Sequence, residues 1–177
     1  GSLTSNITVE SGGKLQLQND VSIITSTNIT ISAGGNLNWF GGTIDISNGY
    51  IYSESNISMG VYGECTLLAD YSSIYAETLT IGEQGTMYGT NWSYVDTFNN
   101  NGTIYVGGYF SYTRCFGDFN QSSTGTMVIE LMSDISYEQF TVSNGLNTQG
   151  NSSIEGTLQL VSNSGYNPSG STMFEVF

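Results

Sequence analysis

The stretch "NITVESGGKLQL" at positions 6–17 is followed by a near copy, "NITISAGGNLNW", at positions 28–39. Both copies begin with Asn-Ile-Thr and carry a Gly-Gly pair near the middle. Apolar and polar residues alternate on either side of the glycines, which is the period of a half-buried β-strand, and the glycines mark the bend between two strands. Each copy therefore predicts two short strands joined by a tight corner.

A third short strand follows each copy, with Val21 and Ile23 in the first repeat and Ile44 and Ile46 in the second. Three strands in a repeat of 22 residues predict one turn of a parallel β-solenoid. Stacked turns of such a solenoid lie about 4.8 Å apart and bury one continuous core. We therefore expect an all-β chain that forms a right-handed parallel β-solenoid (β-helix), with residues 1–177 as a single domain.

The repeat continues in "NISMGVYGECTL" (56–67) and "LTIGEQGTMYG" (79–89), which are again 22 residues apart. The interval from Asn28 to Asn56 is longer, so we place an insertion near "NGYIYSES". This alignment predicts four inward pairs and one outward hydroxyl column. The pairs are Ile7–Ile29, Val9–Ile31, Leu15–Leu37 and Ile57–Leu79, and the column is Thr8, Thr30, Ser58 and Thr80.

Composition excludes several classes of function. Lys14 and Arg114 are the only basic residues, against fifteen carboxylates, so the chain cannot neutralise a phosphate backbone and we exclude nucleic-acid binding. Histidine is absent, which excludes Ser-His-Asp, Cys-His and His-metal sites. The carboxylates are spread singly, and no calcium-loop motif is present. We expect no enzymatic activity, no metal site and no cofactor.

The same composition bears on location. No apolar run approaches the ~18 residues of a membrane span, so we expect no span. An acidic surface with almost no Lys favours an extracellular or cell-surface location. No signal-peptide pattern is present, so we expect a mature or trimmed chain.

Seven Asn-X-Ser/Thr sequons are candidate glycosylation sites. They lie at Asn6, Asn28, Asn56, Asn91, Asn101, Asn120 and Asn151. Asn6 and Asn28 occupy equivalent positions, so we expect them to stack on one edge of the solenoid. Two interpretations stay open: an Asn ladder whose amides form hydrogen bonds from turn to turn, or a glycan-bearing edge of a glycoprotein.

Two further sets of residues are candidates. Cys65 and Cys115 either form one disulfide, as an extracellular location permits, or are two buried thiols in the core. Aromatic residues at outward positions either form cross-turn ladders that stiffen the sheet or bind sugars or a partner protein. The candidates for such surface binding are Tyr105, Tyr109, Tyr112 and Trp92.

The segment "GTLQLVSNSGYNPSGSTMFEVF" (156–177) resembles the terminal segment of passenger domains in bacterial autotransporter adhesins and related cell-surface solenoids. The shared pattern is Gly-Thr-Leu-x-Leu, a spacer, a Gly-aromatic-x-Pro-x-x-Gly motif and then Phe-x-Val, and "NNNGTIYVGG" (99–108) is similar to the Asn-Gly-Thr-Ile turns of the same group. The resemblance implies a right-handed β-solenoid at the cell surface. It supplies no catalytic residue.

These observations predict a non-enzymatic structural protein, either the subunit of a self-assembling filament or sheath or a cell-surface adhesin module. Open strand edges at the solenoid ends favour self-association, end to end or by donation of the strand "MFEVF" (173–177), and a glycan or protein partner is also compatible with the surface. One alternative is a carbohydrate-binding module with an exposed Tyr/Trp face. The other alternative is a polysaccharide-cleaving β-helix enzyme.

Overall fold

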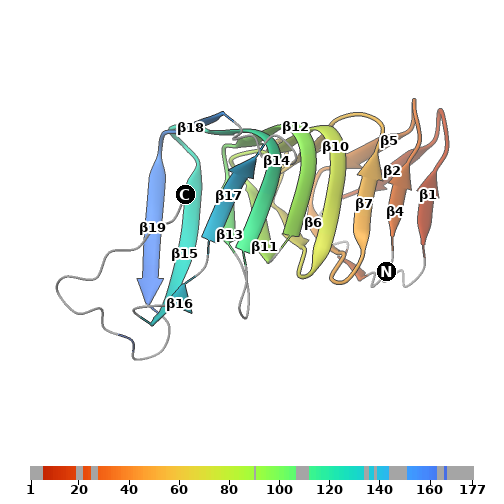
Figure 1. The fold of residues 1–177 in the computed structure, drawn as a ribbon. Coiled ribbons are helices and arrows are strands. Elements are labelled where there is room, and N and C mark those ends of the chain that lie inside the picture. Colours follow the sequence, from red (N-terminus) through yellow and green to blue (C-terminus); the bar gives the residue numbers. More distant parts are fainter. Residues whose placement is uncertain are drawn as a thin grey trace.

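The computed structural model describes residues 6–18, 22–24, 28–89, 91–106, 112–133, 136–137, 139–143, 151–162 and 166. For residues 22–24, 91, 112, 132, 133, 136 and 137 it describes the backbone alone. Every regular element in this part of the chain is a β-strand. The strands of successive turns stack side by side from β1 at one end to β19 at the other (Figure 1). The predicted all-β solenoid is confirmed.

The strands form three sheets, which we name A, C and B. In the A sheet, the main order is β1 (Ile7–Val9), β4 (Ile29–Ile31), β7 (Tyr50–Ser53), β10 (Ser72–Ile81), β12 (Asn91–Asn100), β14 (Tyr112–Gln121) and β17 (Gln139–Ser143). Two more strands join the A sheet beside this path: β8 (Ile57–Met59) pairs with β10, and β18 (Ser152–Ile154) pairs with β14.

The C sheet runs along another side of the same turns. Its order is β16 (Ser136–Tyr137), β15 (Thr126–Ser133), β13 (Thr103–Val106), β11 (Gly85–Gly89), β9 (Cys65–Leu68), β6 (Gly42–Asp45) and β3 (Ser22–Ile24), and β19 (Thr157–Ser162) also pairs with β15. The short B sheet contains β2 (Lys14–Leu17) and β5 (Asn36–Trp39). Among the described strands, every pairing is parallel except that of β15 with β16.

The register confirms all four predicted inward pairs. They are Ile7–Ile29 and Val9–Ile31 in β1 and β4, Leu15–Leu37 in β2 and β5, and Ile57–Leu79 in β8 and β10. One core of aliphatic and aromatic side chains runs through the turns, with Ile7, Leu15 and Leu37 only partly buried against it. The corners also follow the prediction, because Gly12 and Gly34 both adopt left-handed backbone angles, with φ of 76° and 77°.

The predicted insertion near "NGYIYSES" is wrong. This stretch contains β7, which pairs directly with β4 and places Ile51 over Ile29. Ile57 instead begins a second column, because a bend between β7 and β8 divides one side of the turn into two strands. In the next turns the two segments are continuous, as the 10-residue strands β10, β12 and β14 show. The predicted hydroxyl column is therefore split, with Tyr52 following Thr30 and Thr80 following Ser58.

Close stacking of the corners requires glycine at particular levels. A Cβ atom on Gly102 would collide with the backbone carbonyl oxygens of Gly82 and Gly85 in the preceding turn. Gly102 itself is buried, and its carbonyl accepts a hydrogen bond of 2.7 Å from the Thr126 N–H in the following turn. The corner thus brings three successive turns into backbone contact at a point where any side chain would separate them.

Candidate functional site

At the end of the solenoid that contains β19, the described residues form a layer with exposed apolar side chains. This C-terminal layer contains β17, β18 and β19, and none of the three strands carries a charged residue. Ile154, Leu158 and Leu160 are 40%, 39% and 47% exposed. Leu158 lies over Met127 and Leu160 over Ile129, both of which are buried. The core columns of the C sheet therefore continue into side chains that face solvent.

The opposite side ends in an N-terminal layer of β1, β2 and β3. Each strand has a hydrogen-bonded neighbour on one side only within the described residues: β4, β5 and β6, respectively. Lys14 is the one charged residue in these three strands. Unpaired parallel edges with few charges are the surfaces on which another strand or another chain adds most readily.

Aromatic side chains form a column on the outer face of the A sheet, made of Tyr52, Tyr75, Tyr94 and Phe116. Their ring centroids are 6.2, 4.8 and 4.5 Å apart in that order. The last two pairs are stacked face to face, with interplanar angles of 4° and 1°. Each inner ring packs its faces against the rings of the adjacent turns. The column therefore stiffens the sheet and leaves mainly ring edges exposed to solvent.

The structure does not bring the predicted surface-binding aromatics together. Trp92 is 44% exposed on the A sheet, whereas Tyr105 is 38% exposed on the C sheet and stacks on Tyr88 at 4.4 Å. Tyr109 and the side chain of Tyr112 lie outside the described residues. Trp92 and Tyr105 thus belong to different faces and form no common platform.

A hydroxyl column that the sequence analysis missed runs the length of the C sheet. Its members are Thr43, Thr66, Thr86, Thr103, Thr126 and Thr157, and the backbone register places position 22 next to Thr43. Two residues further along each strand, the residues change from Asp45 and Leu68 to Tyr88 and Tyr105 and then to Val128, which is buried. The hydroxyl column is regular, but the neighbouring column, two residues further along each strand, is not. The face of the C sheet therefore lacks a regular two-dimensional array of hydroxyl groups.

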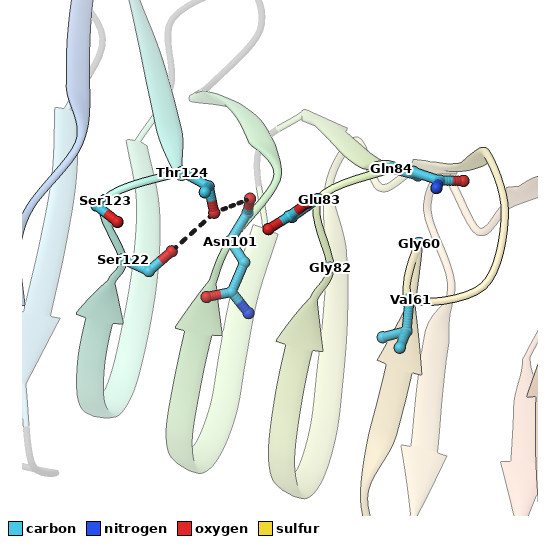
Figure 2. A pocket seen from close by; sticks show the side chains of 9 residues that line it. All are labelled: Gly60, Val61, Gly82, Glu83, Gln84, Asn101, Ser122, Ser123 and Thr124. Carbon is cyan, nitrogen blue, oxygen red and sulfur yellow. Dashed lines mark hydrogen bonds between the residues drawn. The ribbon is translucent and has the colours of Figure 1, made fainter.

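A polar groove of about 480 Å³ crosses the corners of four turns (Figure 2). It arises because one corner is shorter than its neighbours. Asn101 and Gly102 alone join the paired positions 100 and 103, whereas four residues join 81 to 86 and four join 121 to 126. The lining is Gly60, Val61, Gly82, Glu83, Gln84, Asn101, Ser122, Ser123 and Thr124.

Hydroxyl groups hold one wall of this groove in place. The Thr124 Oγ1 donates a hydrogen bond of 3.0 Å to the Asn101 carbonyl and lies 3.1 Å from the Ser122 Oγ. The Glu83 side chain points toward Asn101 from the opposite wall (Figure 2). Glu83 is the one carboxylate in the lining, whereas glycoside cleavage requires a pair of carboxylates. The groove can offer hydrogen bonds to a polar ligand.

The sequons differ in exposure. Asn6, Asn56, Asn120 and Asn151 are exposed, Asn28 and Asn101 are half-buried, and the side chain of Asn91 lies outside the described residues. The Asn28 N–H donates to the Asn6 Oδ1 at 3.1 Å, and the Asn120 Nδ2 donates to the Asn99 Oδ1 at 3.3 Å. Both bonds join neighbouring turns, but the first uses the backbone N–H of Asn28 and not its side-chain amide, so the choice between ladder and glycan-bearing edge stays open.

The two cysteines are buried, free thiols. Cys65 lies in β9 of the C sheet and donates to the Trp39 carbonyl at 3.5 Å, and Cys115 lies in β14 of the A sheet. The disulfide interpretation is therefore not what the structure shows. Burial raises the pKa of both thiols, and for Cys115, where the charge of Asp118 adds to burial, the pKa reaches about 12.

Among the described residues, no group of three or more Cys, Asp or Glu side chains could hold a metal ion. No helix in the same part of the chain is long and apolar enough to cross a membrane. The chain matches no protein-family model, no curated protein and no solved structure in the comparisons made.

Proposed function

We propose that this chain is a non-enzymatic structural protein of the extracellular space or cell surface, which self-associates through the strand edges at the ends of its solenoid. It serves as the subunit of a filament or sheath, or as an adhesin module. The observation that carries the proposal is the exposure of Ile154, Leu158 and Leu160 in an uncharged terminal layer, with both leucines directly in line with the buried core. Water-exposed core columns favour association with another apolar edge.

Two features support a non-enzymatic role. The chain has no histidine, and the described groove contains a single carboxylate. A protein that acts by shape and association needs neither an acid–base pair nor a metal. The formal net charge of −13 and the exposed sequons at Asn6, Asn56, Asn120 and Asn151 fit an extracellular glycoprotein, as does the resemblance of residues 156–177 to autotransporter passenger domains.

Carbohydrate binding is a second candidate function, and the groove favours it more than the aromatic face does. Amide, hydroxyl and carboxylate groups from Gln84, Asn101, Ser122 and Glu83 can bind sugar hydroxyls, and the volume lies in the range of small-ligand sites. The stacked faces of Tyr75, Tyr94 and Phe116, in contrast, are covered by one another. A glycan-binding adhesin would therefore use the groove.

The first test measures association over a concentration series by light scattering and negative-stain microscopy at physiological salt. We expect rods or fibres. Leu158→Asp with Leu160→Asp should raise the concentration at half-assembly at least about tenfold, because each buried leucine contributes roughly 1.5–3 kcal/mol. Tyr62→Asp is the matched control, since Tyr62 is 77% exposed but lies in a corner away from the terminal layers.

A glycan array run in parallel separates the two candidate functions. A monomer at every concentration, combined with specific sugar retention that Glu83→Gln weakens, would overturn the structural proposal. Assembly that the leucine variants suppress and the Tyr62 variant leaves unchanged would support it.

A further inference from the structure

Two strand columns run from one terminal layer to the other. The A-sheet column that begins with β1 ends with β17, and the C-sheet column that begins with β3 ends with β19. The remaining strands, β2 and β18, each lie between the A-sheet and C-sheet strands of their own turn in chain order. Each layer therefore presents three strand edges, in the same order along the chain.

We infer that a second copy of this chain covers the exposed apolar edge, head to tail: the C-terminal layer of one copy stacks on the N-terminal layer of the next. This inference rests on the proposed function and specifies its partner, polarity and register. Such a contact is heterologous and does not close on itself, so it generates filaments rather than dimers.

The direction of the strands determines the polarity. Pairing is parallel throughout the two columns that connect the layers, so a translation along the solenoid axis places β17 beside β1 and β19 beside β3 as parallel partners. A head-to-head contact would reverse the direction of all strands and also the order in which the three edges follow one another. The A-sheet and C-sheet columns could then not continue together as parallel pairings.

The register follows from the hydroxyl column. Thr157 ends this column and the backbone register places Ser22 at its start, so Thr157 of one copy lies opposite Ser22 of the next. The same register sets Leu158 opposite Ile23, which continues the core column of Met127. On the A sheet, Ser143 follows Phe116 and meets Thr8. The contact thus repeats the pairing that already exists inside each copy.

The distribution of charge favours these faces over the sides of the rod. Fifteen carboxylates against two cations make two copies repel one another at most relative positions. The strands of the two terminal layers carry a single charge, Lys14, and it is positive, while Glu10 and Glu155 lie in the adjoining corners. End-to-end contact therefore brings together the least acidic edges of an acidic molecule.

The test uses two single variants of the full chain, Ser22→Cys and Thr157→Cys, and a short bismaleimide cross-linker. The native Cys65 and Cys115 are buried and do not compete. We expect a cross-linked dimer when the two variants are mixed, and none when either is treated alone. Thr86→Cys is the matched control: it belongs to the same hydroxyl column at a central level and should not cross-link to Ser22→Cys.

The outcomes separate the inference from the proposed function. Cross-linked dimers of Ser22→Cys alone or of Thr157→Cys alone would show head-to-head or tail-to-tail contact and overturn the inference, while self-association itself would stand. Assembly that disappears when residues 172–177 are removed, without a mixed cross-link in the full chain, would indicate strand donation and also overturn it. No assembly in any variant would remove the proposed function as well.

Discussion

Cys115 shows, at the scale of a single residue, how completely the solenoid core excludes water. Its side chain has no exposed surface, and its Sγ lies 3.9 Å from the Gly117 carbonyl. Burial raises the pKa of this thiol from its ordinary value of 9.0 to about 12, with a further contribution from the charge of Asp118. The folded protein therefore keeps the proton at pH values where the unfolded chain loses it.

This difference predicts a loss of stability at alkaline pH. Between about pH 9 and pH 12 the folded state binds up to one more proton at Cys115 than the unfolded state, so the free energy of unfolding falls as pH rises, by up to about 1.4 kcal/mol per pH unit. Well below pH 9 the thiol is protonated in both states and has no effect. Urea unfolding at pH 8 to 10.5 should show a shallower decline for Cys115→Ser than for the wild type.

Tyr88 and Tyr94, whose pKa values are also raised by burial, act in the same direction and remain in both proteins. Identical pH slopes for Cys115→Ser and wild type would contradict the assignment. Cys65→Ser serves as the comparison, since the pKa of Cys65 is also raised by burial but is lowered in part by its hydrogen bond to the Gly60 backbone.

Individual residues of the core could be predicted where a repeat was visible. The pairs Ile7–Ile29 and Leu15–Leu37 followed directly from the two copies of the opening motif. The position of Tyr52 over Thr30 could not, because aligning Asn56 with Asn28 hid the fact that β7 is already the next strand of the column. An alternating pattern gives the period of a strand but not which of two adjacent columns it joins.

At the scale of the element, the aromatic column links β7, β10, β12 and β14 across the outer face of the A sheet. Tyr94 is its centre, 4.8 Å from Tyr75 and 4.5 Å from Phe116. Aromatic pairs contribute about 0.5–1.5 kcal/mol each beyond the area that they bury. The aromatic column therefore connects adjacent turns on the outer face of the A sheet, where no hydrophobic core packs against the strands.

Tyr94→Ala should lower the free energy of unfolding by about 2 kcal/mol, because it removes two stacked pairs at once. Tyr62→Ala is the control: Tyr62 forms one tilted contact with Phe40 at 5.7 Å and is largely exposed, so the loss should be small. Chemical denaturation with a tyrosine-independent readout, such as far-ultraviolet circular dichroism, measures both. Equal losses would show that the column does not stabilise the sheet.

The sequence contained the signal for the hydroxyl column of the C sheet, but in irregular form. The dipeptide Gly-Thr occurs six times, and the threonines that follow Gly42, Gly85, Gly102, Gly125 and Gly156 belong to the column, whereas the one that follows Gly89 lies outside the described residues. The corners that separate them differ in length, so a search for a fixed interval does not connect them. The same variation in corner length produces the groove at Asn101, which the sequence alone did not indicate.

At the scale of the whole molecule, each turn contacts only the turns beside it, as in other solenoids. Strands β10, β12 and β14 have partners along both edges, whereas β1, β2 and β3 have a partner along one edge within the described residues. Stability should therefore be greatest at the centre and decrease toward both ends.

Hydrogen exchange followed by mass spectrometry tests this gradient. Amides of β12 should exchange roughly a hundredfold more slowly than those of β1 and β19 in dilute, unassembled protein. Concentrating the protein into assemblies should slow exchange in β1 and β19 while β12 changes little. Uniform protection in the dilute protein would contradict the gradient.

The stacking direction also sets how the molecule would carry force. The backbone hydrogen bonds between turns, such as that from the Thr126 N–H to the Gly102 carbonyl, connect one layer to the next along the rod. Tension along this axis loads the layers in series, so the weakest junction opens first while the others stay closed. Each turn of about 22 residues that detaches would release roughly 70 Å of chain. A rod built in this way lengthens under load in discrete steps, one detached turn at a time, before it breaks.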